Sequence, residues 1–262
     1  MHYNSSSFEI KIKNAFSEKL PGVKVVFFDE TDSTNTRAKL YAKGKEDRGS
    51  AFFIARRQTA GRGRLGRSFL SEEGGLYMSY LSYPNLPAAD AIKLTAYSAV
   101  ALCDTVREFC DAEAGIKWVN DCFIGEKKLA GILTEGEFAE DGSRFEYTVV
   151  GIGVNLLRID FGSLSDIATD LESECGAAVD ISDFAVSLAV KLSEFESSDP
   201  AVYMKRYSEL SVLTGIRVKV ITPTENYFAK VLGVNPDGSL SVELDSGEKK
   251  DLISGDVSVR LD

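Results

Sequence analysis

An arginine- and glycine-rich loop, residues 56–67, is the segment of this sequence with the clearest chemical potential. It carries five arginines in twelve positions, although the whole chain has a net charge of −10. Guanidinium groups bind phosphate or carboxylate through paired, charge-assisted hydrogen bonds, and glycines let the backbone approach a ligand closely. Because like charges repel, we expect the loop to be mobile until an anion orders it. Taken alone, the loop could equally be a solvated basic segment or an RNA contact.

Three glycines of this loop, Gly61, Gly63 and Gly66, match the pattern G-x-G-x-x-G of nucleotide-binding loops. The dinucleotide-binding form requires a helix directly afterwards, whereas residues 68–75 have no apolar periodicity and end in glycines. The kinase form requires V-A-I-K and H-R-D motifs, and a Walker A loop requires a Lys-Ser/Thr ending, and the sequence has neither. The glycine pattern therefore indicates none of these three classes.

The overall composition narrows the chemistry further. A strongly acidic chain argues against broad binding of nucleic acid or anionic membranes. His2 is the only histidine, which removes histidine-dependent triads and histidine-ligated zinc. No apolar run approaches the ~18 residues of a membrane span, and the first residues lack the pattern of a secretory signal. We therefore expect a cytoplasmic protein in which all four cysteines are reduced thiols: Cys103, Cys110, Cys122 and Cys175.

Hydrophobic periodicity predicts two domains, residues 1–213 and 214–262. The first alternates predicted strands and helices, an α+β pattern with a mixed sheet and flanking helices. Its predicted strands are 23–28, 51–55, 76–81, 115–118, 129–138 and 145–155. Four helices are predicted in this domain. One ends at about Tyr41, one spans 88–110, one begins at a cap residue, Ser182, and one follows Pro200. Strands predicted at 216–221, 227–234, 240–244 and 257–261 indicate a small barrel docked on the first domain.

Four further motifs accompany the arginine loop in order along the chain. They are Asp32-Ser33-Thr34-Asn35, Lys117-Trp118-Val119-Asn120-Asp121, Lys128-Leu129-Ala130-Gly131-Ile132-Leu133 and Gly151-Ile152-Gly153-Val154-Asn155. With Gln58 and the loop, they resemble the motifs of biotin protein ligases over nearly the whole chain beyond Val23. The resemblance implies a catalytic domain like that of class II aminoacyl-tRNA synthetases and a C-terminal SH3-like barrel. It implies the monofunctional type, because about twenty residues before the first strand are too few for a three-helix DNA reader.

The resemblance also assigns residues to the substrates. For biotin it implies Ser33, Thr34, Asn35, Gln58, Gly61, Arg62, Gly63, Arg64, Lys128 and Gly131. For ATP and the adenylate it implies Arg62, Arg64, Arg67, Phe69, Asn120, Lys128 and Asn155. The implied catalytic residues are Lys128, Asp121, Arg64 and Lys117. Hydroxyls and amides suit the neutral ureido ring of biotin, because they both donate and accept hydrogen bonds.

Several of these residues also have a purely structural interpretation. The segment 32–35 is typical of a helix N-cap, Trp118 of a buried core aromatic, and Phe69 of a hydrophobic loop anchor. A lysine at a strand end, such as Lys117, is usually solvated. The family commonly has proline where this chain has Val119, and we expect valine to keep an extended path with less rigidity.

The activity implied by the resemblance has two steps. The biotin carboxylate attacks the α-phosphorus of ATP, giving biotinyl-5′-AMP and pyrophosphate, and a lysine of a biotin carboxyl carrier protein then takes the biotinyl group. Lys128 would lie between carboxylate and α-phosphate, and Mg²⁺ would accompany ATP without a dedicated protein site. Asp121 would orient the acceptor amine or, alternatively, contact the metal. The implied partners include no DNA and no membrane, and a homodimer is compatible with the resemblance.

Two other functions fit part of the pattern. A lipoate ligase, or a lipoyl or octanoyl transferase, would share the fold, and the transferases need a cysteine nucleophile. Cys122 has no evident activating base, and the arginine–glycine loop and terminal barrel favour biotin. A non-enzymatic RNA-binding protein would interleave aromatic residues with the arginines, and residues 56–67 contain none.

Overall fold

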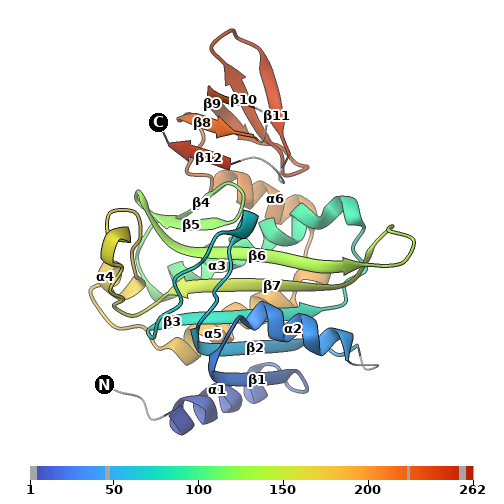
Figure 1. The fold of residues 1–262 in the computed structure, drawn as a ribbon, viewed down its shortest axis with the longest axis vertical. Helices are drawn as coiled ribbons and strands as arrows, with labels where there is room; N and C mark the ends of the chain where they lie inside the picture. The colour runs from blue at the N-terminus through green and yellow to red at the C-terminus, as the bar shows by residue number, and fades with distance from the viewer. Residues whose placement is uncertain (1–4, 45–47, 223–224, 254–257, 262) are drawn as a thin grey trace.

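A seven-stranded mixed sheet organises the larger part of the molecule (Figure 1). The computed structural model describes residues 5–44, 48–222, 225–253 and 258–261. The strand order is β1-β2-β3-β7-β6-β5-β4, and β1 and β2 form its one parallel pair. The strands are β1 (Lys24–Thr31), β2 (Ala51–Gln58), β3 (Gly75–Ser82), β4 (Ala114–Lys117), β5 (Asp121–Ile124), β6 (Lys127–Phe138) and β7 (Phe145–Asn155). The predicted α+β class with a mixed sheet is confirmed.

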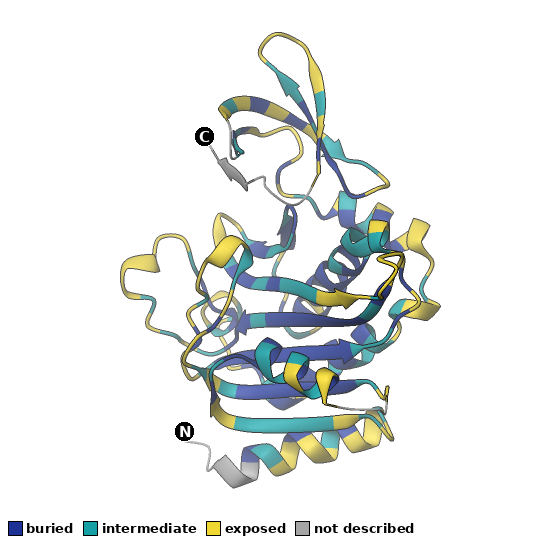
Figure 2. Cartoon of the chain, turned by 45° about the vertical axis from the view of Figure 1, so that its right-hand side comes forward, coloured by how far each residue is buried: buried dark blue, intermediate teal, exposed yellow. Residues whose placement is uncertain are grey.

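Helices cover both faces of this sheet. α3 (Ala91–Phe109) and α5 (Ile181–Ser193) pack on one face, and α2 (Thr34–Lys43) packs on β2, β3 and β7 from the other. Successive side chains of a strand point to opposite faces, so Phe52 of β2 joins the core cluster under α3 and α5. The next residue, Phe53, packs with α2. Figure 2 shows the central strands buried along most of their length.

Several elements were missing from the sequence prediction. α1 (Ser5–Lys19) packs on α5 and on the edge strand β1, and the centre of the Phe16 ring lies 5.3 Å from that of Phe52 on β2. The segment between the predicted strands 115–118 and 129–138 contains the four-residue strand β5 and then a turn at Gly125, where φ is +56°. α4 (Leu171–Cys175) was also not predicted, whereas α6 (Pro200–Glu209) is the helix expected after Pro200. In the described part of the chain, no helix combines the length and apolar content needed to cross a bilayer.

A second, five-stranded antiparallel sheet follows α6, with the order β11-β10-β9-β8-β12. Its strands are β8 (Arg217–Ile221), β9 (Asn226–Val234), β10 (Leu240–Leu244), β11 (Lys249–Leu252) and β12 (Ser258–Leu261). β11 was not predicted from sequence, whereas the other four strands were. This small sheet corresponds to the predicted C-terminal barrel.

The small sheet docks on the larger part through buried polar and apolar contacts. Trp118, at the end of β4, is buried, and its Nε1 donates to the carbonyl oxygen of Gly238 at 2.9 Å. Gly238 also packs closely on Ile92, and Ser208 Oγ donates to the carbonyl oxygen of Val234 at 3.1 Å. The structural interpretation of Trp118 as a core aromatic is confirmed, and the indole also holds the two parts together.

The cysteines differ from the expectation of four reduced thiols. A disulfide joins Cys110, at the C-cap of α3, to Cys175, the last residue of α4. Cys103 and Cys122 are free and buried, with their Sγ atoms 3.6 Å apart. The expectation is therefore wrong for one pair. Folding brings residues 65 positions apart to a Cα–Cα distance of 5.5 Å, within the range of a disulfide, and sequence spacing cannot show this.

The start of α5 also corrects a predicted cap. Asp180, not Ser182, occupies the N-cap, and its carboxylate accepts from the backbone N–H groups of Ser182 at 2.9 Å and Asp183 at 3.2 Å. Lys11 of α1 pairs with the same carboxylate. Burial raises the pKa of Asp180, but Lys11 and the backbone donors lower it more strongly, so the folded pKa lies below its ordinary value.

Replacing Asp180 with alanine should lower the free energy of unfolding at neutral pH by about 1 kcal/mol, the usual cost of losing an N-cap. A carboxyl group whose folded pKa is lowered stabilises the fold above its unfolded pKa and loses this effect as pH falls through the folded value. The difference from the unmodified chain should therefore shrink below about pH 4. Urea unfolding at several pH values measures it, with Asp183→Ala as the exposed, non-capping control; equal losses in both variants would contradict the assignment.

Candidate active site

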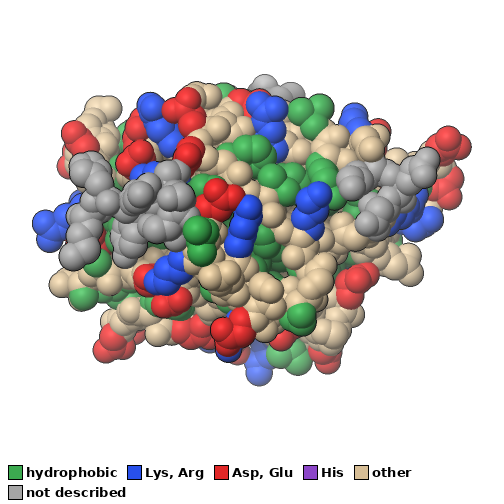
Figure 3. Space-filling view, turned by 90° about the horizontal axis from the view of Figure 1, so that it is seen from below, with side chains coloured by type: hydrophobic (Ala, Val, Ile, Leu, Met, Phe, Trp, Pro, Cys, Tyr) green, Lys and Arg blue, Asp and Glu red, His purple; other side chains and the backbone are tan. Residues whose placement is uncertain are grey.

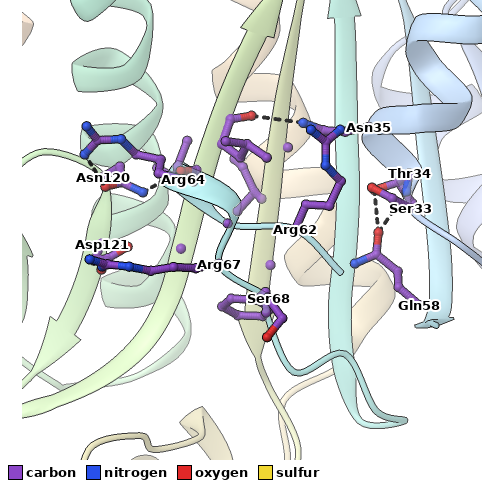
Figure 4. A pocket seen from close by; sticks show the side chains of 18 of the residues that line it. Ser33, Thr34, Asn35, Gln58, Arg62, Arg64, Arg67, Ser68, Asn120 and Asp121 are labelled. Atoms are coloured by element: carbon purple, nitrogen blue, oxygen red, sulfur yellow. Dashed lines mark hydrogen bonds between the residues drawn. The ribbon is translucent and has the colours of Figure 1, made fainter. Parts of the chain in front are cut away.

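A cavity opens where the start of α2, the end of β2, the arginine loop, β5, β6 and β7 meet (Figure 4). It measures about 800 Å³, open solvent at its mouth included. Thirteen of the residues assigned from sequence line it: Ser33, Thr34, Asn35, Gln58, Arg62, Gly63, Arg64, Arg67, Phe69, Asn120, Asp121, Lys128 and Gly131. The fold thus brings together side chains that lie up to about a hundred positions apart in the sequence.

One end of the cavity is neutral and polar. Gln58 Oε1 accepts from the backbone N–H of Thr34 at 2.8 Å and from its hydroxyl at 3.1 Å, and Gln58 Nε2 donates to Ser71 Oγ at 3.0 Å. Ser79, buried on β3, lies with its hydroxyl 2.7 Å from Thr34 Oγ1 and 2.6 Å from Asn35 Oδ1. These hydroxyl and amide groups hold one another in place. Sequence reasoning missed Ser71 and Ser79, which carry no motif signal.

The position of Ser33 bears out part of the structural alternative for this segment. Ser33 is the N-cap of α2, with an extended backbone, but its side chain makes no capping hydrogen bond. Ser33 and Thr34 are each only 3% exposed. The start of the helix therefore places both residues at the cavity wall, and the hydroxyl of Ser33 makes no capping hydrogen bond.

Glycines of β6 and β7 form the floor of the cavity. A Cβ atom on Gly151 would lie 2.0 Å from Asn35 Oδ1, and one on Gly153 would lie 2.6 Å from the Phe69 ring. A Cβ on Gly131 would lie 3.1 Å from Lys128 Nζ. These spacings explain the glycines of the motifs at 128–133 and 151–155, because any larger residue would displace a side chain of the site.

The opposite end of the cavity is charged. Lys128 Nζ lies 2.7 Å from Asp121 Oδ1 and 5.7 Å from the centre of the Phe69 ring. Arg64 Nη1 donates to Asn120 Oδ1 at 3.2 Å, and burial lowers the pKa of Arg64 while the Asp121 carboxylate partly opposes this shift. A guanidinium stays charged in proteins nevertheless. This end therefore offers two cations and a carboxylate within one short span.

The arginine loop folds as a small hairpin over the cavity, and we call residues 59–70 the lid. Its two arms pair at Arg62 and Ser68, and the backbone N–H of Gly63 donates to the carbonyl oxygen of Arg67 at 2.7 Å. Gly61 is buried at the base of the lid, where a Cβ would clash with the Phe69 carbonyl and Ser71.

Acidic neighbours offset the expected repulsion among the loop arginines. Arg57, at the end of β2, pairs with Glu30 at 3.0 Å, and Arg62 of the lid pairs with Glu135 at 3.1 Å. Arg56 lies in β2 as well and approaches Glu73 at 3.4 Å. Glu30 and Glu135 are distant from the loop in sequence, so the charge pattern of the loop does not reveal these partners.

Three residues assigned from sequence do not line the cavity. Lys117 lies with its Nζ 5.0 Å from the centre of the Phe123 ring. Asn155 is buried and donates to the carbonyl oxygen of Thr169 at 3.0 Å. Gly61 shapes the lid from below. Phe69 packs on Gly153 and lines the cavity, so its interpretation as a loop anchor is confirmed, and contact with a nucleotide stays a prediction.

Comparison with known proteins identifies the family. Residues 27–155 match the model of the biotin/lipoate A/B protein ligase family, and residues 214–260 match that of the biotin protein ligase C-terminal domain. The chain is 30% identical over 259 residues to the bifunctional ligase/repressor BirA of Bacillus subtilis, across 96% of this chain and 78% of the relative. The chain belongs to the biotin protein ligase family.

Two further relatives agree with this assignment. A biotin–[acetyl-CoA-carboxylase] ligase of Paracoccus denitrificans is 36% identical over 173 residues, across 64% of this chain and 70% of the relative. The structure of the biotin protein ligase from Aquifex aeolicus in complex with biotin and ATP superposes with a TM-score of 0.76 at 27% identity. That alignment covers 91% of this chain and 99% of the other.

Two local features of this biotin protein ligase concern residues singled out from sequence. The peptide bond between Trp118 and Val119 is cis. Cys122 is fully enclosed beside Cys103, and the Cys103 thiol and burial raise the pKa of Cys122 well above its ordinary value. A buried, protonated thiol is a poor nucleophile, so Cys122 does not support the transferase alternative.

The glycine floor can be tested by Gly151→Ala. The new Cβ would collide with Asn35 Oδ1, so we expect the free energy of unfolding to fall by about 1–3 kcal/mol, the usual cost of overpacking. Thermal or urea unfolding measures this. Gly44→Ala is the matched control, because a Cβ there would make only ordinary contacts at 3.6 Å or more. A Gly151→Ala protein as stable as the control would show that Asn35 is not held where the structure places it.

Proposed function

We propose that this biotin protein ligase uses ATP to convert biotin into biotinyl-5′-AMP and then transfers the biotinyl group to a lysine of a biotin carboxyl carrier protein of acetyl-CoA carboxylase or a related carboxylase. The observation that carries the proposal is the division of one cavity into a neutral, hydrogen-bonding end and a cationic end. Biotin has the same division, with a ureido ring at one end and a carboxylate at the other. The relatives named above support both substrates.

At the neutral end, Ser33, Thr34, Asn35 and Gln58 would receive the ureido ring. A urea carries two N–H donors and one carbonyl acceptor, which hydroxyl and amide groups can match without any net charge. Because Gln58 is held by Thr34 and Ser71, this end needs little rearrangement on binding.

At the cationic end, two anions have to meet. A biotin carboxylate oxygen forms a bond to the α-phosphorus of ATP, the bond from that phosphorus to the oxygen bridging to the β-phosphate breaks, and pyrophosphate leaves. Lys128 would neutralise the carboxylate and the α-phosphate, and Arg64 and Arg67 would approach the remaining phosphate charge from the lid. Arg62, which is paired with Glu135, would add positive charge from farther away. Asn120 and Phe69 would contact the nucleotide. Neither Lys117 nor Asn155 lines the cavity. We therefore assign Lys117 only a long-range electrostatic contribution and Asn155 only a structural hydrogen bond to Thr169.

In the second step, the amine of the acceptor lysine attacks the acyl carbon of the mixed anhydride. The bond from that carbon to the phosphate oxygen breaks, AMP leaves, and the amine loses a proton as the amide forms. A free lysine amine is almost entirely protonated at neutral pH. Asp121, which already pairs with one ammonium group at 2.7 Å, would orient the incoming amine and take its proton.

The residues of the cavity do not fit a dedicated magnesium site. Among the described residues no group of three or more His, Cys, Asp or Glu side chains could hold a metal ion, and Asp121 faces Lys128. Magnesium would therefore arrive on the phosphates of ATP, and we assign no step to a metal held by the protein.

Lys128→Ala should reduce biotin-dependent exchange of pyrophosphate into ATP by about a hundredfold or more, the usual cost of removing one preorganised charge-stabilising group. Lys127→Ala is the matched control, since Lys127 is exposed and donates to the carbonyl oxygen of Ser165 outside the cavity. Near-normal exchange in Lys128→Ala would remove Lys128 from the adenylation step.

We propose further that the chain acts in the cytoplasm, where ATP and free biotin are present, and does not bind an operator. The face seen in Figure 3 mixes acidic and basic side chains, and α1 is engaged with α5 and β1 instead of being presented to DNA. A gel shift at low salt should show no sequence-selective retardation; a selective shift would contradict this.

A homodimer is not required, because every contact proposed comes from one chain.

A further inference from the structure

Glu135, a residue of β6, contacts both the neutral pocket and the lid. Its Oε2 accepts from Asn35 Nδ2 at 3.0 Å and from Arg62 Nη1 at 3.2 Å. Its Oε1 lies 3.1 Å from Arg62 Nη2 and accepts from Lys39 Nζ at 2.6 Å. The Arg62 guanidinium therefore engages both carboxylate oxygens, in the paired geometry that makes such contacts strong. One carboxylate joins α2, β6 and the lid.

The Glu135 carboxylate is sheltered and charged. Its side chain is 20% exposed. Burial by itself raises the pKa of Glu135, but hydrogen bonds from Lys39 and Asn35 and the charges of Lys39 and Arg62 bring it below its ordinary value. Without this negative charge, Lys39 and Arg62 would face each other as two unneutralised cations, and their repulsion would push the lid away from α2.

Glu135 also determines how the Asn35 amide is oriented. The two hydrogens of Asn35 Nδ2 go to Glu135 and to the carbonyl oxygen of Leu133 at 3.1 Å, and Asn35 Oδ1 accepts from Ser79 at 2.6 Å. Asn35 is only 3% exposed, so solvent offers these groups no substitute partners. Because Asn35 and Lys39 lie four residues apart on α2, both face β6, and a single acid can serve them.

We propose that Glu135 is a positioning residue that couples the pocket for the ureido ring to the lid. It holds Arg62 beside Asn35 before any anionic ligand arrives, so that the lid is already placed over the cavity when biotin enters. Figure 4 shows Arg62 reaching from the lid toward Asn35, at the opposite side of the cavity from Arg64 and Arg67. The inference rests on the proposed function for its effect on the adenylate, but not for its effect on the lid.

Glu135→Gln separates these roles, because glutamine keeps the length and one acceptor oxygen for Asn35 but cannot neutralise Arg62. Without ligand, trypsin should cleave after Arg62 and Arg64 about tenfold faster than in the unmodified chain, the change expected from losing a charge-assisted hydrogen bond. With ATP, Mg²⁺ and biotin, biotinyl-5′-AMP should leave about tenfold faster, whereas the maximal rate of pyrophosphate exchange should stay within about threefold.

The chain offers two matched controls. Glu137, two positions along β6, pairs with Lys43 of α2 at 3.2 Å and accepts from Tyr147 at 2.9 Å. Glu137→Gln therefore removes the same charge from the same strand without touching the lid. Lys39→Gln removes one partner of Glu135 but leaves the pair with Arg62. Both variants should be cleaved at the rate of the unmodified chain.

A second variant covers the case in which Glu135→Gln does not fold. Arg62→Gln breaks the same pair from the lid side, so trypsin should cleave faster after Arg64, and combining it with Glu135→Gln should add nothing further. Unchanged cleavage in the pair variants, or the same acceleration in Glu137→Gln, would overturn the inference. Absence of adenylate in the unmodified chain would contradict the proposed function, whereas the cleavage comparison uses no ligand and would still decide the role of Glu135.

Discussion

The chemistry assigned to this ligase requires two anions to approach each other within one cavity, and the arrangement of charge around that cavity follows from this requirement. Lys128, Arg64 and Arg67 supply positive charge at one end, whereas hydroxyl and amide groups form the other end, with the Arg62–Glu135 pair beside them. Each cation needs a partner before the ligand arrives. Asp121 and Glu135 provide carboxylates for Lys128 and Arg62, and the anions of the substrates would replace Asp121 at Lys128.

The large sheet makes this arrangement possible through small residues and strand ends. β6 and β7 bring glycines to the floor, so that Asn35, Phe69 and Lys128 can lie directly on the sheet. The neutral residues come from the start of α2 and the end of β2, and the lid returns to the sheet at β3. Buried helices behind the sheet fix these strands, and the lid is the part held chiefly by polar contacts.

The sequence predicted most of the strands and most of the cavity because each depends on local pattern. Strand alternation and the arginine–glycine loop are visible residue by residue, but β5 lies between two turns and β11 is mostly charged, so neither shows an apolar alternation. The Cys110–Cys175 pair, Ser79 and Glu135 gain their roles only from distant neighbours. Lys117 and Asn155 belong to the sequence motifs but do not line the cavity. This could not be predicted, because the sequence at a strand end does not reveal which way a side chain points.

In this account, one cavity binds a urea through neutral hydrogen-bonding groups, while cations neutralise an acyl phosphate at its other end. Retention of the intermediate tests this most directly. The purified chain would be incubated with ATP, Mg²⁺ and biotin, freed of small molecules by gel filtration, and analysed by mass spectrometry. The account predicts a stoichiometric amount of biotinyl-5′-AMP travelling with the protein. Protein that carries neither biotin nor its adenylate would contradict it.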